Sequence, residues 1–205
     1  MIAFFLKLYR WMYREMHLYV SNLWCYCIFS LNKIQYRSFN AYGIPDIEIQ
    51  SSGKCSFGEN LILVSNSRIA TLGKNNKCKI LVYSNAELII GNKVGMSNVT
   101  IIASTSIKIG NNVLFGGGVT IADTDFHSLN PKHWHTSSDF EQMKRKPVVI
   151  GNNVFIGMNA IILKGVKVGS NSVVAAGSVV VKDVPDGEIW GGNPARFIKN
   201  NYIQK

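Results

Sequence analysis

Three of the four histidines in this 205-residue chain lie close together, at His127, His133 and His135. An imidazole titrates near neutral pH, so a histidine on a loop can take a proton from a hydroxyl group as a general base. Three imidazoles could instead bind a zinc ion that activates water. Zinc chemistry requires ligands that are fixed on rigid elements, whereas these three share one segment. We therefore favour proton transfer and expect no metal.

Two carboxylates precede His127 in the same segment, Asp123 and Asp125. A nearby carboxylate often orients or polarises a catalytic imidazole, which would give Asp125 a place in the catalytic machinery. The alternative is turn chemistry, in which an aspartate side chain bonds to its own backbone. Both interpretations remain open from the sequence alone.

The elements that must position these side chains repeat with a period of six residues. Aliphatic residues recur at this spacing without a miss, at Ile150, Ile156, Ile162, Val168, Val174 and Val180. Neither a helix nor an ordinary strand has this period, so the unit is a short strand plus a turn, repeated and stacked. The sequence therefore predicts an all-β solenoid whose aliphatic side chains point into a shared core.

The same register can be followed upstream, with one break. It includes Ile90, Met96 and Ile102, then slips by one residue and resumes at Ile109, Phe115 and Ile121. The next matching aliphatic is Ile150, so residues 122–149 are predicted to leave the solenoid as an excursion loop. We expect an N-terminal element over 1–40, the solenoid over 41–185 and a short tail over 186–205.

Four stretches resemble the hexapeptide-repeat acyltransferases: Pro147 to Gly157, Lys164 to Gly169, Ala175 to Pro185, and Gly191 to Arg196. By motif order the chain is similar to galactoside and maltose O-acetyltransferases and to the O-acetyltransferases of lipopolysaccharide or capsule assembly. The resemblance covers roughly residues 85–200. It implies a left-handed parallel β-helix, usually assembled as a homotrimer, that uses acetyl-CoA as acyl donor.

The resemblance also implies roles for single residues. The catalytic base would be His127, because it follows Val119-Thr120-Ile121 and precedes the restart at Pro147. Its acceptor hydroxyl would attack a thioester carbonyl while a backbone N–H stabilises the oxyanion. The expected substrate contacts are Asn98, Asp123, Phe155 and Trp134. The chain departs from the family pattern at Met96 and Ser104, which leaves the acceptor open.

Coenzyme A would bind along the last coils. Carried over position by position, the expected contacts are Met158, Ala176, Val181, Lys182, Arg196 and Lys199. The ammonium group of Lys182 and the guanidinium fork of Arg196 suit phosphate groups. The alternative for both is ordinary solvated charge.

Residues 1–35 differ from the rest of the chain in being strongly apolar and aromatic. Lys7, Arg10 and Arg14 stand at helical spacings and form one basic stripe. An interfacial helix on the inner membrane surface fits this pattern. Packing of the same face on the solenoid or on a neighbouring subunit is the main alternative, and a true span is a third.

The net charge of +10 calls for an anionic partner. No nucleic-acid-binding signature accompanies the charge, so we expect no nucleic acid. The four cysteines, Cys25, Cys27, Cys55 and Cys78, lack ligand spacing and fit a reducing cytoplasm.

Taken with these patterns, the resemblance implies an acetyl-CoA-dependent O-acetyltransferase that modifies a sugar or a lipid-linked glycan of surface polysaccharide synthesis. It would work in the cytoplasm, peripheral to the inner face of the membrane. The alternatives are an enzyme that acetylates antibiotics or other small molecules, a zinc carbonic anhydrase-like protein, and a non-enzymatic trimeric scaffold.

Overall fold

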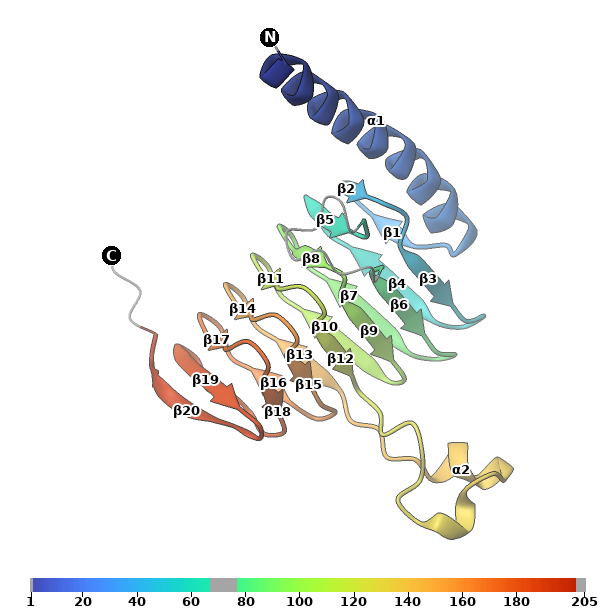
Figure 1. The fold of residues 1–205 in the computed structure, drawn as a ribbon. Helices are drawn as coiled ribbons and strands as arrows, with labels where there is room; N and C mark the ends of the chain where they lie inside the picture. The colour runs from blue at the N-terminus through green and yellow to red at the C-terminus, as the bar shows by residue number, and fades with distance from the viewer. Residues whose placement is uncertain (1, 67–76, 202–205) are drawn as a thin grey trace.

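A computed structural model describes residues 2–66 and 77–201 of the chain. In this part the strands form three sheets that wrap around one axis (Figure 1). Met1 and residues 67–76, which belong to the predicted segments 1–40 and 41–185, lie outside the described residues. So do residues 202–205 of the predicted tail.

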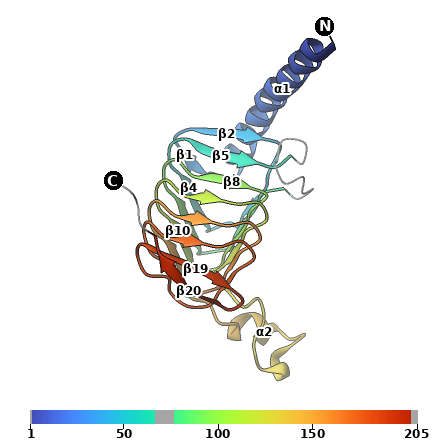
Figure 2. The same ribbon diagram turned by 60° about the vertical axis from the view of Figure 1, so that its left-hand side comes forward.

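From β1 to β18, successive strands enter the first, second and third sheet in turn, and each pairs in parallel with the strand one coil away. The first sheet contains β1 (Gln35–Tyr36), β4 (Lys54–Phe57), β7 (Glu87–Ile90), β10 (Ser106–Ile109), β13 (Val148–Ile150) and β16 (Lys167–Val168). The second contains β2 (Phe39–Tyr42), β5 (Leu61–Val64), β8 (Gly95–Ser97), β11 (Leu114–Phe115), β14 (Phe155–Ile156), β17 (Val173–Val174), β19 (Glu188–Gly192) and β20 (Ala195–Asn200). The third contains β3 (Asp46–Ile49), β6 (Lys79–Val82), β9 (Thr100–Ala103), β12 (Thr120–Ala122), β15 (Ile161–Ile162) and β18 (Val179–Val180). The stacked coils form a parallel β-helix, which confirms the predicted solenoid (Figure 2).

The core of the last coils follows the predicted six-residue period. All six aliphatics of that repeat, Ile150 to Val180, are at most 1% exposed. In the middle coils the register differs from the prediction, because Ile101 is fully buried while Ile102 is partly exposed. Met96 and Ile101 are five positions apart and Ile101 and Ile109 are eight apart, so the register shortens by one residue before β9 and lengthens by two after it. The cause is a short corner between β8 and β9.

Polar side chains join successive coils at the corner between the first and second sheets. The backbone N–H of Asn92 donates to Oδ1 of Asn111 at 2.8 Å, and that of Asn111 donates to Oδ1 of Asn152 at 2.7 Å. The N–H of Asn152 donates to Oγ of Ser170 at 3.1 Å, and that of Ser170 to Oδ1 of Asp186 at 2.8 Å. We call this series the corner ladder. It supplies backbone donors that an isolated turn would leave to water.

Helix α1 (Ile2–Leu31) closes the N-terminal end of the β-helix with its last turns. Cys25 and Phe29 are fully buried there. The side chain of Asn22 accepts a hydrogen bond from the N–H of Ala41 at 2.7 Å, and Oγ of Ser21 accepts one from Gly43 at 2.9 Å. These contacts cover the backbone of the edge strand β2, which would otherwise be an exposed template for pairing.

The rest of α1 extends away from the coils (Figures 1 and 2). Among the helices of the described residues, none is both long and apolar enough to cross a membrane. The β-helix itself starts at β1, so residues 35–40 of the predicted N-terminal element belong to the first coil.

The predicted tail is a hairpin within the described residues. Its strand β19 pairs in parallel with β17, and β20 turns back antiparallel to β19. The excursion predicted over 122–149 lies between β12 and β13 and contains the 3₁₀ helix η1 (Pro131–His133) and the helix α2 (Ser137–Gln142), drawn in yellow in Figure 1.

Candidate active site in the excursion

The base of the excursion is held by Asp123, whose side chain is fully buried. Its carboxylate accepts hydrogen bonds from the backbone N–H groups of Ser104, Thr105 and Ser106 at 2.6, 2.7 and 2.8 Å. The hydroxyl of Thr105 donates a fourth at 2.9 Å. A buried carboxylate needs this degree of compensation. Asp123 therefore faces the preceding coil, which corrects the substrate contact that the sequence predicts for it.

Asp125 forms an ion pair with Lys164, and not with the imidazole of His127 that it was predicted to orient. Its Oδ1 lies 2.5 Å from Nζ of Lys164, and only about a fifth of each side chain is exposed (21% and 22%). The other oxygen, Oδ2, is buried without a hydrogen-bond partner. Asp125 thus ties the excursion to the following coil. The carboxylate that contacts His127 is a different one, so the orienting role predicted for Asp125 is corrected as well.

The short helix α2 is anchored to the coils through two side chains. The ring of Phe140 lies 6.1 Å from that of Tyr83. The guanidinium of Arg145 lies 4.6 Å from the centre of the Phe140 ring, and its Nε donates to Oγ of Ser104 at 2.9 Å. These contacts fix the position of Asp139, which stands in the first turn of α2.

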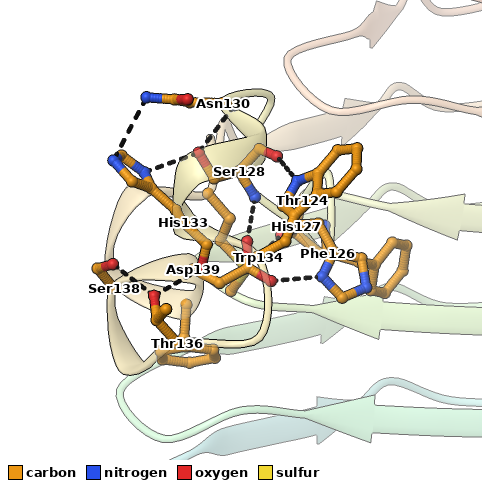
Figure 3. Close-up of polar contacts among 12 residues, drawn as sticks. Thr124, Phe126, His127, Ser128, Asn130, His133, Trp134, Thr136, Ser138 and Asp139 are labelled. Atoms are coloured by element: carbon orange, nitrogen blue, oxygen red, sulfur yellow. Dashed lines mark hydrogen bonds and ion pairs between the residues drawn. The ribbon is translucent and has the colours of Figure 1, made fainter.

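Asp139 is the carboxylate that holds His127 (Figure 3). Nδ1 of His127 lies 2.6 Å from Oδ2 of Asp139, and the N–H of Ser128 donates to Oδ1 at 2.6 Å. The imidazole side chain is 73% exposed, whereas that of Asp139 is 14% exposed. Phe126, directly before His127, has a φ of 66°. A bulky residue rarely adopts this left-handed conformation, and such strain clusters at functional sites.

The electrostatics of the pair define which imidazole nitrogen can react. The hydrogen bond from His127, followed by that from the N–H of Ser128, holds the pKa of Asp139 below its usual value. Asp139 is therefore ionised at neutral pH and favours a proton on Nδ1 of His127. A neutral imidazole in this tautomer carries its lone pair on Nε2, the nitrogen that can accept a proton from a substrate.

Ser128 links this pair to the neighbouring aromatic ring. Besides its N–H bond to Asp139, its carbonyl oxygen accepts from Nε1 of Trp134 at 2.7 Å, and its Oγ lies 3.1 Å from Nδ1 of His133 (Figure 3). Ser128 is itself buried, at 5% exposure. One backbone position thus sets the places of both Asp139 and Trp134.

A cavity of about 300 Å³ opens beside the imidazole, lined by His127, Trp134, His135 and Asp139. Trp134 is 48% exposed and presents apolar surface to this space. The arrangement combines an imidazole, a carboxylate that contacts it and an aromatic wall. It can bind a small polar molecule with an apolar face and take a proton from one of its hydroxyl groups.

The predicted coenzyme A residues lie elsewhere on the chain. Met158 and Ala176 stand at successive corners after β14 and β17, and a Cβ added at Gly157 would meet the backbone N of Ala176 at 2.5 Å. Val181 and Lys182 follow β18 directly. Arg196 and Lys199 are exposed on β20. All six thus belong to the last coils and the closing hairpin.

The remaining predicted substrate contacts do not join the cavity. Asn98 is buried, at 3% exposure, in the corner after β8. Phe155 is 47% exposed on β14, where it is paired between Leu114 and Val173 of the neighbouring strands. Of the four residues predicted to contact substrate, only Trp134 lies beside His127.

Two site residues escaped the sequence analysis, Asp139 and Ser128. Asp139 follows a helix-start pattern at Thr136-Ser137, which identifies an acidic first turn but no contact with an imidazole twelve residues earlier. Ser128 acts mainly through its backbone, which no side-chain pattern reveals. Within residues 2–66 and 77–201, no three side chains of the metal-binding types are placed to hold an ion.

Comparison with known proteins bears on these coils directly. Residues 147–182 match the family model described as the hexapeptide repeat of succinyl-transferase. These coils are hexapeptide repeats. The chain is also 38% identical over 133 residues to the galactoside O-acetyltransferase of Escherichia coli strain K12, a match that covers 63% of each chain. The predicted resemblance to hexapeptide-repeat acyltransferases is therefore confirmed.

Solved structures agree with this assignment. A hexapeptide-repeat acetyltransferase from Vibrio cholerae, determined in complex with acetyl-CoA, is 32% identical, with a TM-score of 0.51 over 62% of this chain and 64% of that one. The N-acyltransferase AntD from Bacillus cereus, in complex with dTDP and coenzyme A, has a TM-score of 0.62 at 17% identity, over 82% of this chain and 84% of its own. The fold is thus a left-handed parallel β-helix, as predicted.

The repeat-bearing chain spans less than two thirds of the galactoside O-acetyltransferases that it matches. The coverage is 63% of the Escherichia coli enzyme and 44% of the enzyme from Lactococcus lactis.

Proposed function

We propose that this chain is an acetyl-CoA-dependent O-acetyltransferase whose acceptor is a hydroxyl group of a sugar or glycan. The observation that carries the proposal is the contact of His127 with Asp139 beside the half-exposed ring of Trp134. Two comparisons support it: the similarity to galactoside O-acetyltransferase and the likeness to an acetyltransferase bound to acetyl-CoA.

The reaction needs one base and two substrates. Nε2 of His127 takes the proton of the acceptor hydroxyl, and the hydroxyl oxygen attacks the carbonyl carbon of the acetyl thioester. A backbone N–H stabilises the oxyanion of the tetrahedral intermediate. The carbon–sulfur bond then breaks, and the imidazolium returns its proton to the sulfur of coenzyme A. Asp139 stabilises the imidazolium while it exists, so atoms and charges balance without another reactant.

The donor binds along the last coils in this proposal. Lys182, Arg196 and Lys199 contact the phosphate groups of coenzyme A, which carry negative charge. Backbone groups at Met158, Ala176 and Val181 bind its pantetheine arm. The exposure of Lys182 and Arg196 supports this, because both charges are accessible to a ligand.

We infer a sugar acceptor because the ring of Trp134 forms an apolar wall beside His127. The apolar body of an aromatic ring suits the C–H face of a sugar, while the imidazole and carboxylate bind its hydroxyl groups. The acceptor class that we infer is an intermediate of lipopolysaccharide or capsule synthesis, lipid-linked or free, modified in the cytoplasm. Contact of residues 1–35 with the inner membrane surface stays a prediction.

The active unit is a homotrimer in this proposal. The high exposure of the imidazole, 73% in one chain, supports a site that a neighbouring copy completes. Phe155, which is exposed and lies away from His127 within one chain, would then serve the site of the next copy.

Calorimetric titration with acetyl-CoA tests the donor without knowledge of the acceptor. We expect the wild-type chain to bind acetyl-CoA and the Lys182→Ala, Arg196→Ala double variant to bind it at least about tenfold more weakly, since each charged hydrogen bond contributes about 1.5–3 kcal/mol. The Arg37→Ala, Lys79→Ala variant removes the same charge from the first coils and should bind normally. Absence of binding by the wild-type chain would contradict the proposed donor.

A panel of sugar acceptors then tests the reaction through release of the coenzyme A thiol. Turnover that is lost in His127→Ala, while acetyl-CoA still binds, is the expected result. Equal turnover by His127→Ala would contradict the assignment of the base.

A further inference from the structure

Helix α1 carries an exposed apolar row over most of its length. Phe5, Tyr9, Met12, Met16, Tyr19 and Leu23 are all between 56% and 74% exposed. We call these six residues the α1 seam. Monomeric proteins rarely expose a contiguous apolar patch of this kind unless it has a partner.

The spacing of the α1 seam is that of a coiled coil. Its intervals alternate between four and three residues over its whole length, from Phe5 to Leu23. An average of 3.5 residues keeps such a row in line when helices supercoil around each other, whereas an isolated amphipathic helix follows 3.6. No charged residue interrupts the row.

The α1 seam lies on the opposite side of the helix from the face that docks on the β-helix. Docking uses Ser21, Cys25 and Phe29, which are buried. At 3.6 residues per turn, Leu23 is rotated about 200° from Cys25 and so points away from the coils. The β-helix of the same chain therefore does not cover the seam.

The charges of α1 favour a second copy over a lipid surface. Lys7, Arg10 and Arg14 lie near the docking side, where they occupy the outermost positions of the heptad pattern. A helix that lies on an anionic membrane presents its cations beside the buried apolar face. Here the cations point away from the seam, as on the outside of a helix bundle.

The area of the α1 seam is also sufficient. Its three aromatic side chains, Phe5, Tyr9 and Tyr19, carry roughly 150–250 Å² each, and its methionines and leucine are smaller. Six that are more than half exposed present on the order of 600 Å² per helix, close to the roughly 800 Å² per partner of a stable interface.

We propose that the α1 helices of two or more copies of this chain pack together along the α1 seam as a coiled-coil bundle. This interface is separate from the acetyl-transfer chemistry, so the two proposals can fail independently. Met16 lies near the middle of the seam, where copies meet whichever way the helices run.

Oxidative cross-linking of the full chain tests the interface. The variant Met16→Cys is made on a Cys27→Ser background, because Cys27 is exposed. We expect a disulfide between chains at low protein concentration. The matched control Trp11→Cys, whose native side chain is 58% exposed but lies off the seam, should cross-link at least about tenfold less. Equal cross-linking by both variants, or by neither, would overturn the proposal.

A second experiment separates a bundle from a membrane. Tm is measured against protein concentration for the wild-type chain, Met16→Glu and the control Trp11→Glu. A concentration dependence that Met16→Glu weakens and Trp11→Glu leaves unchanged supports the bundle, because any contact between the β-helices contributes equally in all three chains. Binding of the wild-type chain to phosphatidylglycerol vesicles, together with no cross-link at position 16, would identify a lipid surface as the partner and overturn the proposal.

Discussion

Nδ1 of His127 lies 2.6 Å from Oδ2 of Asp139, although the two residues are twelve positions apart. The second oxygen of Asp139 is held by the N–H of Ser128 at 2.6 Å, so the carboxylate cannot rotate without losing one of the bonds. The contact therefore depends on the folding of the whole excursion.

Loss of this carboxylate should slow the reaction without weakening donor binding. We expect Asp139→Asn to lower kcat by about 10²- to 10⁴-fold, because the imidazole loses its fixed tautomer and the stabilisation of its charged form. The KM for acetyl-CoA should stay unchanged. Combining it with His127→Ala should cost little more than His127→Ala alone, because the two residues act as a unit. A full additional loss in the double variant would show that Asp139 acts elsewhere.

The depressed pKa of Asp139 predicts how the contact responds to acid. A carboxyl group of this kind contributes stability above its unfolded pKa of about 3.9 and loses that contribution as the pH falls through the lower, folded pKa. The contact should thus persist from neutral pH down to about pH 4. Carbon NMR of the Asp139 carboxyl group measures this directly, and a midpoint above the ordinary aspartate value would contradict the geometry.

Removal of Asp123 should destabilise the fold as well as the site. Asp123→Ala leaves the N–H groups of Ser104, Thr105 and Ser106 without their acceptor. We expect the free energy of unfolding to fall by about 2–4 kcal/mol. Denaturant unfolding measures this, with Glu141→Ala as a control that removes an exposed acid from α2. A loss equal to that of the control would mean that the clamp contributes nothing.

The cysteines should differ sharply in reactivity. Cys25, Cys55 and Cys78 are buried, and burial raises the pKa of the Cys25 thiol to about 12, so little thiolate forms at pH 8. Cys27 is exposed on α1. A thiol reagent should therefore modify one cysteine in the native chain and four after unfolding, as counted by mass spectrometry. Rapid native labelling of Cys25 would indicate that α1 detaches from the first coil.

The scaffold was well predicted from the sequence because the spacing of the aliphatic residues equals the spacing of the turns in each coil. Aliphatics at Ile150 and every sixth residue after it can be buried together only if the chain turns at that spacing. The middle coils were harder, since Ile101 and Ile102 are both aliphatic and the period alone cannot say which one points inward. The short corner at Asn98, with a φ of 55°, decides it.

The site was harder to predict than the scaffold for a related reason. The partner of His127 is set by the packing of α2 on Tyr83 and Ser104, residues that belong to earlier coils. The spacing of residues near His127 does not reveal its contact with Asp139. Asp125, which is nearer in the sequence, was therefore the natural expectation. Likewise Ser21 and Asn22, which interrupt an apolar stretch, bond to the edge of β2.

The corner ladder joins the coils on either side of the excursion, and no residue of the excursion takes part in it. Asn111 and Asn152 are 41 residues apart, yet they bond as directly as neighbours one coil apart do elsewhere. The mechanical continuity of the scaffold therefore does not pass through the segment that carries His127. A change in the length or sequence of the excursion would therefore leave the ladder that joins the coils intact.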